Sequence, residues 1–113
     1  MTSNLYKIEI FLPEQALDRV QQALAGAHAG EIGNYDHCFS VTAITGYWRP
    51  NAQANPYLGE TEKLSLEKEL KMEVNCREEF LHKAVQAVRK VHPYEEPLIN
   101  IIQLHNEIFG ATV

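Results

Sequence analysis

The order in which two hydrophobic periodicities alternate along the chain restricts its fold more than any other feature of the sequence. Apolar residues that recur with a period of two, or that fill a short segment, indicate strands. Apolar residues that recur every three to four positions indicate amphipathic helices. The predicted strands are residues 5–12, 38–45, 63–75 and 98–104, and the predicted helices are residues 13–26 and 76–91.

The resulting order is strand, helix, strand, strand, helix, strand. Such a chain closes most simply as an α+β, ferredoxin-like (βαββαβ) sandwich, in which one antiparallel four-stranded sheet carries both helices on one face. The middle two strands would form a hairpin with a long connector over residues 46–59. A length of 113 residues fits a single domain over residues 1–113.

The strand pattern is clearest over residues 63–75, where apolar side chains fall on even positions and polar ones on odd positions. The leucine, glutamate and lysine content would suit a helix, but a helix would spread these leucines around its circumference. Lys68 is the one exception on the apolar face. It indicates either a bulge or the point at which the strand passes the edge of the sheet.

The second helix has predicted boundaries at both ends. Asn75 is expected to be its N-cap, with Glu78 three residues on as in a capping box. Pro93 disfavours helical geometry at His92, so the helix should end at about Val91.

The last strand, residues 98–104, is apolar at odd and even positions and is predicted to be buried on most of both faces. Residues 105–113 are expected to form a tail, with a short extra edge strand left open. Ile44 and some apolar residues of the last strand have no predicted helix over them. This suggests that subunits associate through their sheets.

Composition limits the partners. The net charge is −5, from 15 acids and 10 bases, so we expect no nucleic-acid partner and no membrane partner. No apolar run approaches the roughly 20 residues that cross a bilayer, and the first six residues have no signal-peptide character. Cys38 and Cys76 fit neither a metal motif nor a disulfide framework. A cytoplasmic protein with reduced thiols is therefore expected.

Residues 30–38 form the first candidate functional segment. Gly30, Gly33 and Asn34 permit positive φ. Backbone amides of such a loop can bind a ligand, with Asn34, Tyr35 and His37 at the rim. A tight structural loop is the alternative. Cys38 begins the next strand, where a small buried thiol is expected.

Residues 46–50, Gly-Tyr-Trp-Arg-Pro, are the second candidate segment and are predicted to leave the strand before a polar connector. Aromatic residues and arginine dominate binding hot spots, so Tyr47, Trp48 and Arg49 are candidates for a recognition surface. The alternative is that Trp48 anchors the connector on the core.

Residues 92–97, His-Pro-Tyr-Glu-Glu-Pro, are the third candidate segment: a corner made rigid by two prolines. A histidine near carboxylates can titrate near neutrality, which allows acid–base chemistry or metal binding by His92, Glu95 and Glu96. The alternative is structural, with His92 ending the helix and Tyr94 packing inward.

In this order the three segments, together with Asn-Pro-Tyr-Leu-Gly-Glu at residues 55–60, resemble the domain inserted into bacterial YqfO-type proteins of the dinuclear-metal-centre family. That domain has a fold like the PII signalling proteins and CutA, and the resemblance covers about residues 30–104. It implies a PII/CutA-like trimer and a small-molecule site between subunits. The family's two-metal domain has no counterpart in this sequence, so its hydrolase chemistry is not carried over. The family's usual Gly-x-Gly-x-Phe-Arg-Pro has Ile44 in place of one glycine and Trp48 in place of phenylalanine.

Two main hypotheses follow. The first is a non-enzymatic, PII/CutA-like oligomer that binds a small molecule, a metal ion or a protein partner at subunit interfaces. The second is a metal-dependent enzyme that uses the His92–Glu96 corner; a purely structural oligomer is a third. No catalytic residue and no particular cofactor is predicted. The predicted ligand-binding or interface residues are Gly30, Gly33, Asn34, Tyr35, Cys38, Trp48, Arg49, Pro50, His92, Tyr94, Glu95 and Glu96.

Overall fold

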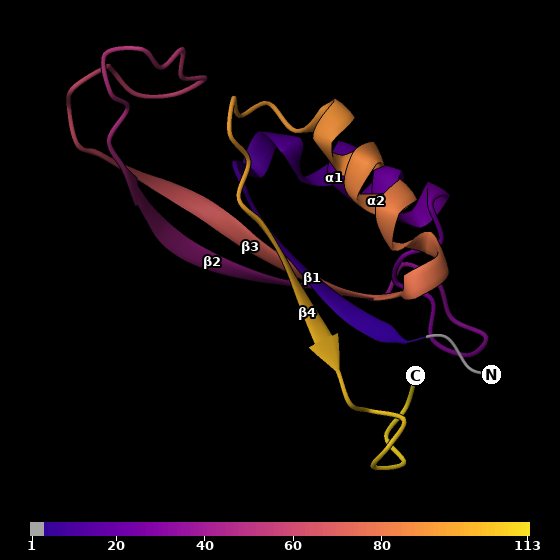
Figure 1. Cartoon of the computed structure of the whole chain (residues 1–113). Coiled ribbons are helices and arrows are strands. Elements are labelled where there is room, and N and C mark those ends of the chain that lie inside the picture. The colour runs from indigo at the N-terminus through magenta and orange to yellow at the C-terminus, as the bar shows by residue number, and fades with distance from the viewer. Residues whose placement is uncertain (1–3) are drawn as a thin grey trace.

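The computed structural model describes residues 4–113 and shows one antiparallel four-stranded sheet, with strand order β2-β3-β1-β4 and both helices on one face (Figure 1). This confirms the predicted ferredoxin-like α+β fold. Part of the stretch on which the signal-peptide prediction rests, residues 1–3, lies outside the described residues. The elements are β1 (Leu5–Leu12), the short 3₁₀ helix η1 (Glu14–Ala16), α1 (Leu17–Gly26), β2 (Phe39–Trp48), β3 (Ser65–Arg77), α2 (Glu78–Val91) and β4 (Ile99–Leu104).

The core lies between the helices and the two central strands. Ile8 and Ile10 of β1 and Met72 of β3 are fully buried there, against Leu24 of α1 and Val88 of α2. Alternation along β1 and β3 places these side chains on the helix-covered face. Burying each of the larger ones contributes about 1.5–3 kcal/mol.

The hairpin β2–β3 extends beyond the rest of the sheet. The pairing of β1 with β3 ends at Leu12↔Leu70, whereas β2 and β3 remain paired to Trp48↔Ser65. We call the segment in which residues 44–48 pair with residues 65–69 the arm; it projects from the body in Figure 1. The register is continuous through Lys68, so Lys68 marks the passage beyond the sheet edge and not a bulge.

The predicted end of the second strand was wrong. β2 continues to Trp48 because Tyr47 pairs with Leu66 across the arm, so residues 46–48 belong to the strand. The connector therefore runs from Arg49 to Leu64. The expectation that Asn75 is the N-cap of the second helix was also wrong, because β3 extends past it.

β3 does not stop at Asn75 but continues to Arg77, which pairs with Leu5 of β1. Arg77 is consequently the N-cap of α2 and makes no side-chain capping bond. The backbone N–H of Glu78 donates instead to the carbonyl of Asn4 at 2.9 Å. The predicted end of this helix at Val91 is confirmed.

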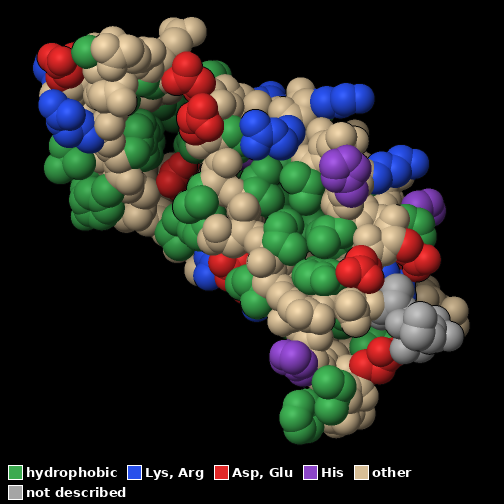
Figure 2. Space-filling view, in the orientation of Figure 1, with side chains coloured by type: hydrophobic (Ala, Val, Ile, Leu, Met, Phe, Trp, Pro, Cys, Tyr) green, Lys and Arg blue, Asp and Glu red, His purple; other side chains and the backbone are tan. Residues whose placement is uncertain are grey.

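β4 is an edge strand that pairs only with β1, and it is less buried in the single chain than predicted. Ile101 and Ile102 point to opposite faces, and they are 41% and 42% exposed. Figure 2 shows hydrophobic side chains gathered over the region between β4 and α2. Residues 105–113 form turns and not an extra edge strand.

Candidate functional site

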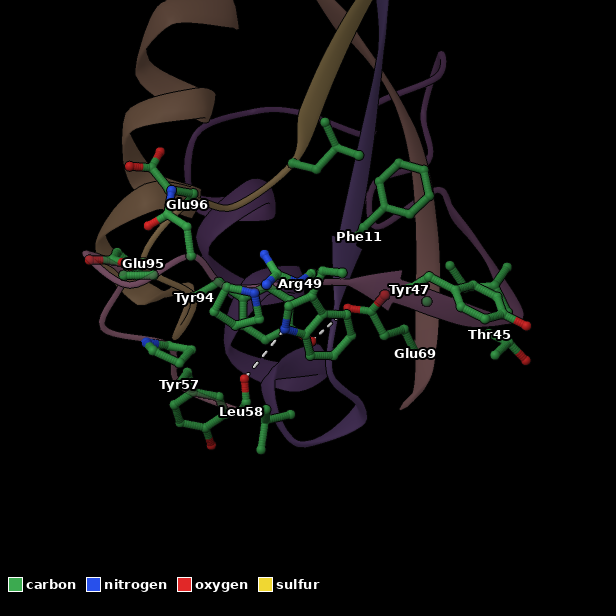
Figure 3. A pocket seen from close by; sticks show the side chains of 18 residues that line it. Phe11, Thr45, Tyr47, Arg49, Tyr57, Leu58, Glu69, Tyr94, Glu95 and Glu96 are labelled. Atoms are coloured by element: carbon green, nitrogen blue, oxygen red, sulfur yellow. Dashed lines mark hydrogen bonds between the residues drawn. The ribbon is translucent and has the colours of Figure 1, made fainter. Parts of the chain in front are cut away.

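A pocket of about 550 Å³ lies where the arm, the connector and the corner formed by residues 92–97 meet (Figure 3). The sequence brings them together because β1 ends at Leu12 while β3 continues, which leaves the side of the arm free for the corner to cover. Five aromatic side chains contribute to the walls: Phe11, Tyr47, Trp48, Tyr57 and Tyr94.

His92 holds the corner in place from behind the pocket. Its Nε2 lies 2.8 Å from the carbonyl oxygen of Phe11, and the backbone N–H of Tyr94 donates to its Nδ1 at 3.2 Å. A carbonyl oxygen only accepts and an amide N–H only donates, so these partners fix the neutral tautomer with the proton on Nε2. Burial lowers the pKa of His92, which also favours the neutral imidazole.

Tyr94 reaches from the corner to the arm. Its hydroxyl donates a 2.6 Å hydrogen bond to Oε2 of Glu69, a residue that is only 8% exposed. Burial, and then this hydrogen bond, raise the pKa of Tyr94 well above its usual range. The phenol therefore remains a donor at physiological pH.

Gly46 makes room for the Glu69 carboxylate. The two residues lie on one face of the arm, because Ile44 is directly opposite Glu69 and Gly46 is two positions further along β2. A Cβ at Gly46 would overlap Oε1 and lie 2.7 Å from Cδ of Glu69. A side chain at position 46 is therefore incompatible with this position of the carboxylate.

Aromatic rings and two hydrogen bonds attach the connector to the pocket. The ring of Tyr94 lies 6.1 Å from those of Trp48 and Tyr57, centroid to centroid. The Trp48 indole N–H donates to the Leu58 carbonyl at 3.4 Å, and Glu95 accepts a 2.9 Å hydrogen bond from the backbone N–H of residue 55. Trp48 thus makes the anchoring contact that was one of its two predicted roles.

The charged groups of the pocket are mostly acidic. Glu69, Glu95 and Glu96 line it together with one cation, Arg49. Arg49 is exposed and makes no ion pair with any residue in the range 4–113. In Figure 2 acidic side chains border the hollow beside the arm.

Two of the three predicted segments meet at this pocket. The predicted site residues that line it are Trp48, Arg49, Pro50, Tyr94, Glu95 and Glu96. His92 lies against Tyr94, with ring centroids 4.9 Å apart.

The third segment lies elsewhere, at the opposite end of the sheet. Gly30 donates to the Asn75 carbonyl, and Asn75 is six residues along β3 from Glu69, or about 20 Å. Within one chain, Gly30, Gly33, Asn34, Tyr35 and Cys38 are therefore remote from the pocket. Their binding role stays a prediction.

The loop over residues 30–38 has the geometry of a tight structural loop. Gly30 has φ +80°, and a Cβ there would lie 2.8 Å from the Phe39 ring. Ile32 and Tyr35 exchange two backbone hydrogen bonds of 2.9 Å, and the Tyr35 side chain is exposed. Cys38 is partly exposed, which corrects the expectation of a buried thiol: it stands just before β2, where the helices do not cover it.

The sequence did not indicate Glu69 or Phe11 as site residues. Both are at positions that alternation assigns to the face without helices, where a charged or partly exposed side chain is ordinary. Tyr57 lies in a segment that the family resemblance singled out, and that was the only available signal for it.

Residues 4–113 contain no group of three or more His, Cys, Asp or Glu residues arranged to hold a metal ion. No helix within the same range is long and apolar enough to span a membrane.

The strand order, the paired helices and the extended hairpin define a PII/CutA-like fold. CutA1 from Ehrlichia chaffeensis superposes with a TM-score of 0.68 at 16% identity, covering 94% of this chain and 86% of CutA1. The Bacillus subtilis GlnK–ATP complex gives 0.64 at 12% identity, over 92% and 84%. At these identities the similarity shows the fold alone.

Sequence comparison relates this chain to a part of several longer proteins. A GTP cyclohydrolase 1 type 2 homolog from Halalkalibacterium halodurans is 41% identical over 94% of this chain, and one from Listeria innocua is 36% identical over 91%. A Bacillus cereus protein related to NIF3 has a TM-score of 0.81 at 29% identity, with 94% of this chain and 27% of that one covered. These relatives confirm the resemblance to the PII/CutA-like domain of YqfO-type proteins.

The chain spans about 28% of the length of the curated relatives that it matches. No family model matches it.

Proposed function

We propose that this chain is an oligomeric, PII/CutA-like module that binds a small molecule in the pocket between the arm and the corner, without catalysing a reaction. The observation that carries the proposal is the pocket itself. Its volume of about 550 Å³ is within the range of small-molecule sites, roughly 300–1,000 Å³, and its walls are mainly apolar and include five aromatic side chains.

The polar groups favour binding over catalysis. A catalytic base must have a free atom within hydrogen-bond reach of a reacting group. Both ring nitrogens of His92 are already engaged by backbone groups, and Glu95 accepts from the connector. The metal-dependent enzyme considered above, which needs these groups and Glu96 to converge, is therefore less well supported.

Binding of a metal ion or of a protein partner is also less well supported than binding of a small molecule. The acidic residues of the pocket belong to no metal-binding group of three within residues 4–113. The pocket is concave and has aromatic side chains in its walls. Such a site suits a small organic molecule better than it suits the flat surface of a protein partner.

The proposal includes self-association, with a trimer favoured by the PII/CutA likeness and the pocket near a subunit interface. The exposed apolar residues on both faces of the edge strand β4 support this, because a free edge with apolar side chains promotes association. We propose a cytoplasmic location, in keeping with the free thiols of Cys38 and Cys76.

A fragment screen by NMR on the ¹⁵N-labelled protein tests the binding proposal. We expect fragments to shift the Trp48 indole signal and the amide signals of Gly46 and Tyr94. Tyr57→Ala should weaken these fragments, whereas Tyr35→Ala, at an exposed tyrosine in the distant loop, should not. Shifts confined to residues 30–38, or equal effects of the two variants, would contradict the proposed site.

Sedimentation velocity tests the assembly. At low micromolar concentration we expect a particle of three times the 12.9 kDa mass of one chain. A particle of one chain mass would count against self-association.

A further inference from the structure

The carboxylate of Glu69 has one oxygen in a hydrogen bond and one that remains accessible at the pocket wall. Its Oε2 accepts the Tyr94 hydrogen bond, whereas Oε1 has no donor among residues 4–113 and keeps access to solvent, because no buried side-chain oxygen in that range lacks a partner. The residue is 8% exposed and contributes to the pocket wall. Removing a carboxylate from water costs free energy unless a cation or several donors replace the lost hydration.

No cation of the described residues compensates this carboxylate. On the same face of the sheet, Lys71 pairs with Glu9 at 3.4 Å and Lys7 pairs with Glu73 at 2.9 Å. Lys68 is adjacent to Glu69 in sequence, but alternation directs it to the opposite face. The pocket wall therefore carries an accessible carboxylate oxygen that has no counter-ion among residues 4–113.

The surroundings of Glu69 suit a cation. The ring of Tyr94 is flanked by those of Trp48 and Tyr57, and aromatic faces attract ammonium groups. The electrostatic environment of the Tyr94 hydroxyl is negative, since the carboxylates of Glu69 and Glu67 both raise its pKa.

Arg49 is the one feature that would favour an anion. Its side chain is exposed, whereas Glu69 is buried in the wall, and Glu95 and Glu96 also line the pocket. Three carboxylates would repel an anionic ligand and one guanidinium would attract it. For a cationic ligand, the three carboxylates attract and the one guanidinium repels.

We infer that the ligand of this pocket is a small organic cation, an ammonium group on a flat apolar body, whose charge is paired with Glu69. The inference rests on the proposed binding function and names the chemical class of its ligand. The ammonium group would lie against Oε1 of Glu69, and the flat body would lie among Trp48, Tyr57 and Tyr94.

The chain offers a direct reporter, because Trp48 is its one tryptophan. We would titrate three probes of similar shape, benzylamine, benzyl alcohol and benzoate, and follow Trp48 fluorescence. The wild-type protein should bind benzylamine about tenfold more tightly than benzyl alcohol, as expected for a partly desolvated cation beside aromatic rings and a carboxylate. Benzoate should bind more weakly than either.

Glu69→Gln keeps the shape of the side chain and an acceptor for Tyr94 but removes the charge. It should abolish the preference for benzylamine while leaving benzyl alcohol affinity within about twofold, which also shows that the variant is folded. Glu79→Gln, on the exposed face of α2, changes the net charge equally and should bind all three probes as the wild type does.

The outcomes separate the two proposals. If Glu69→Gln keeps the benzylamine preference, or if benzoate binds as tightly as benzylamine, the inferred cation is wrong while the pocket remains a binding site. If none of the three probes changes Trp48 fluorescence at millimolar concentration, and the fragment screen is also empty, the binding function itself fails.

Discussion

The hydroxyl of Tyr94 donates to Oε2 of Glu69 across a distance of 2.6 Å, and this hydrogen bond joins the corner to the arm. The two residues are 25 positions apart in sequence and belong to segments that have no other side-chain hydrogen bond to one another among residues 4–113. The position of the arm beside the body therefore depends strongly on one phenol and one carboxylate.

Replacing Tyr94 with phenylalanine removes this hydrogen bond and leaves the buried Glu69 carboxylate without a donor. We expect the free energy of unfolding to fall by about 1–3 kcal/mol, the cost of an unsatisfied buried polar group. Urea denaturation measures it. Tyr35→Phe, at an exposed hydroxyl, should change the stability by less than about 0.5 kcal/mol. Equal stabilities of the two variants would mean that the hydrogen bond contributes nothing.

Replacing Gly46 with alanine places a methyl group where the Glu69 carboxylate lies. We expect destabilisation of about 1–3 kcal/mol, because the carboxylate must leave its position against Gly46 and Tyr94. Gly26→Ala is the control: its Cβ would meet no atom within 4 Å, and a helical alanine stabilises by up to about 1 kcal/mol.

A double-mutant cycle shows whether Glu69 causes the effect. In a Glu69→Ala background the side chain that clashes is gone, so Gly46→Ala should cost at least about 1 kcal/mol less than in the wild type. If the cost is unchanged, the strain at Gly46 has another origin.

His92 should make stability depend on pH. Burial lowers its pKa from the ordinary value of 6.5, an effect that Arg19 reinforces and that the Phe11 carbonyl and Glu69 oppose. Between the folded and unfolded pKa values the unfolded chain binds more protons, so the free energy of unfolding rises with pH there. The stabilisation is fully present above about pH 6.5 and is lost as pH falls toward the folded pKa.

Denaturation midpoints between pH 5 and pH 8 measure this dependence. His92→Gln should flatten the profile in that range. His82→Gln, at an exposed position of α2, should leave it as in the wild type. A native His92 that titrates above 6.5 by NMR would contradict the lowered pKa on which this prediction depends.

Trp48 should protect the connector from proteolysis. Trp48→Ala removes the hydrogen bond to the Leu58 carbonyl and the ring contact with Tyr94, so residues 49–64 should be cleaved faster by a non-specific protease. The control is Tyr47→Ala, which removes an aromatic residue that is 65% exposed. Cleavage of both variants at the wild-type rate would show that the connector is held by other contacts.

Periodicity predicted the parts of the fold that packing against the helices determines. Strand β1 and the end of α2 at Val91 were found from sequence, because core burial and Pro93 fix them locally. The end of β2 was not, because Trp48 remains in the strand only through pairing with β3, a non-local interaction.

The site was predicted only in part for the same reason. Trp48, Arg49 and the corner residues carry unusual chemistry and were visible in the sequence. Glu69 alternates like an ordinary surface residue, and its burial depends on how far β3 extends past β1 and on where Tyr94 reaches. The contact between arm and corner has no sequence signature that alternation could reveal.

The uninterrupted ladder between β2 and β3 has one more consequence. It begins at Phe39↔Val74, where the Phe39 ring lies against Gly30, and ends at Trp48↔Ser65 in the pocket. The glycine loop and the pocket are thus the two ends of a single ribbon, so the twist of that ribbon sets the angle at which each end is presented. A neighbouring chain that contacts the glycine loop would therefore be oriented relative to the pocket by the twist of the same two strands.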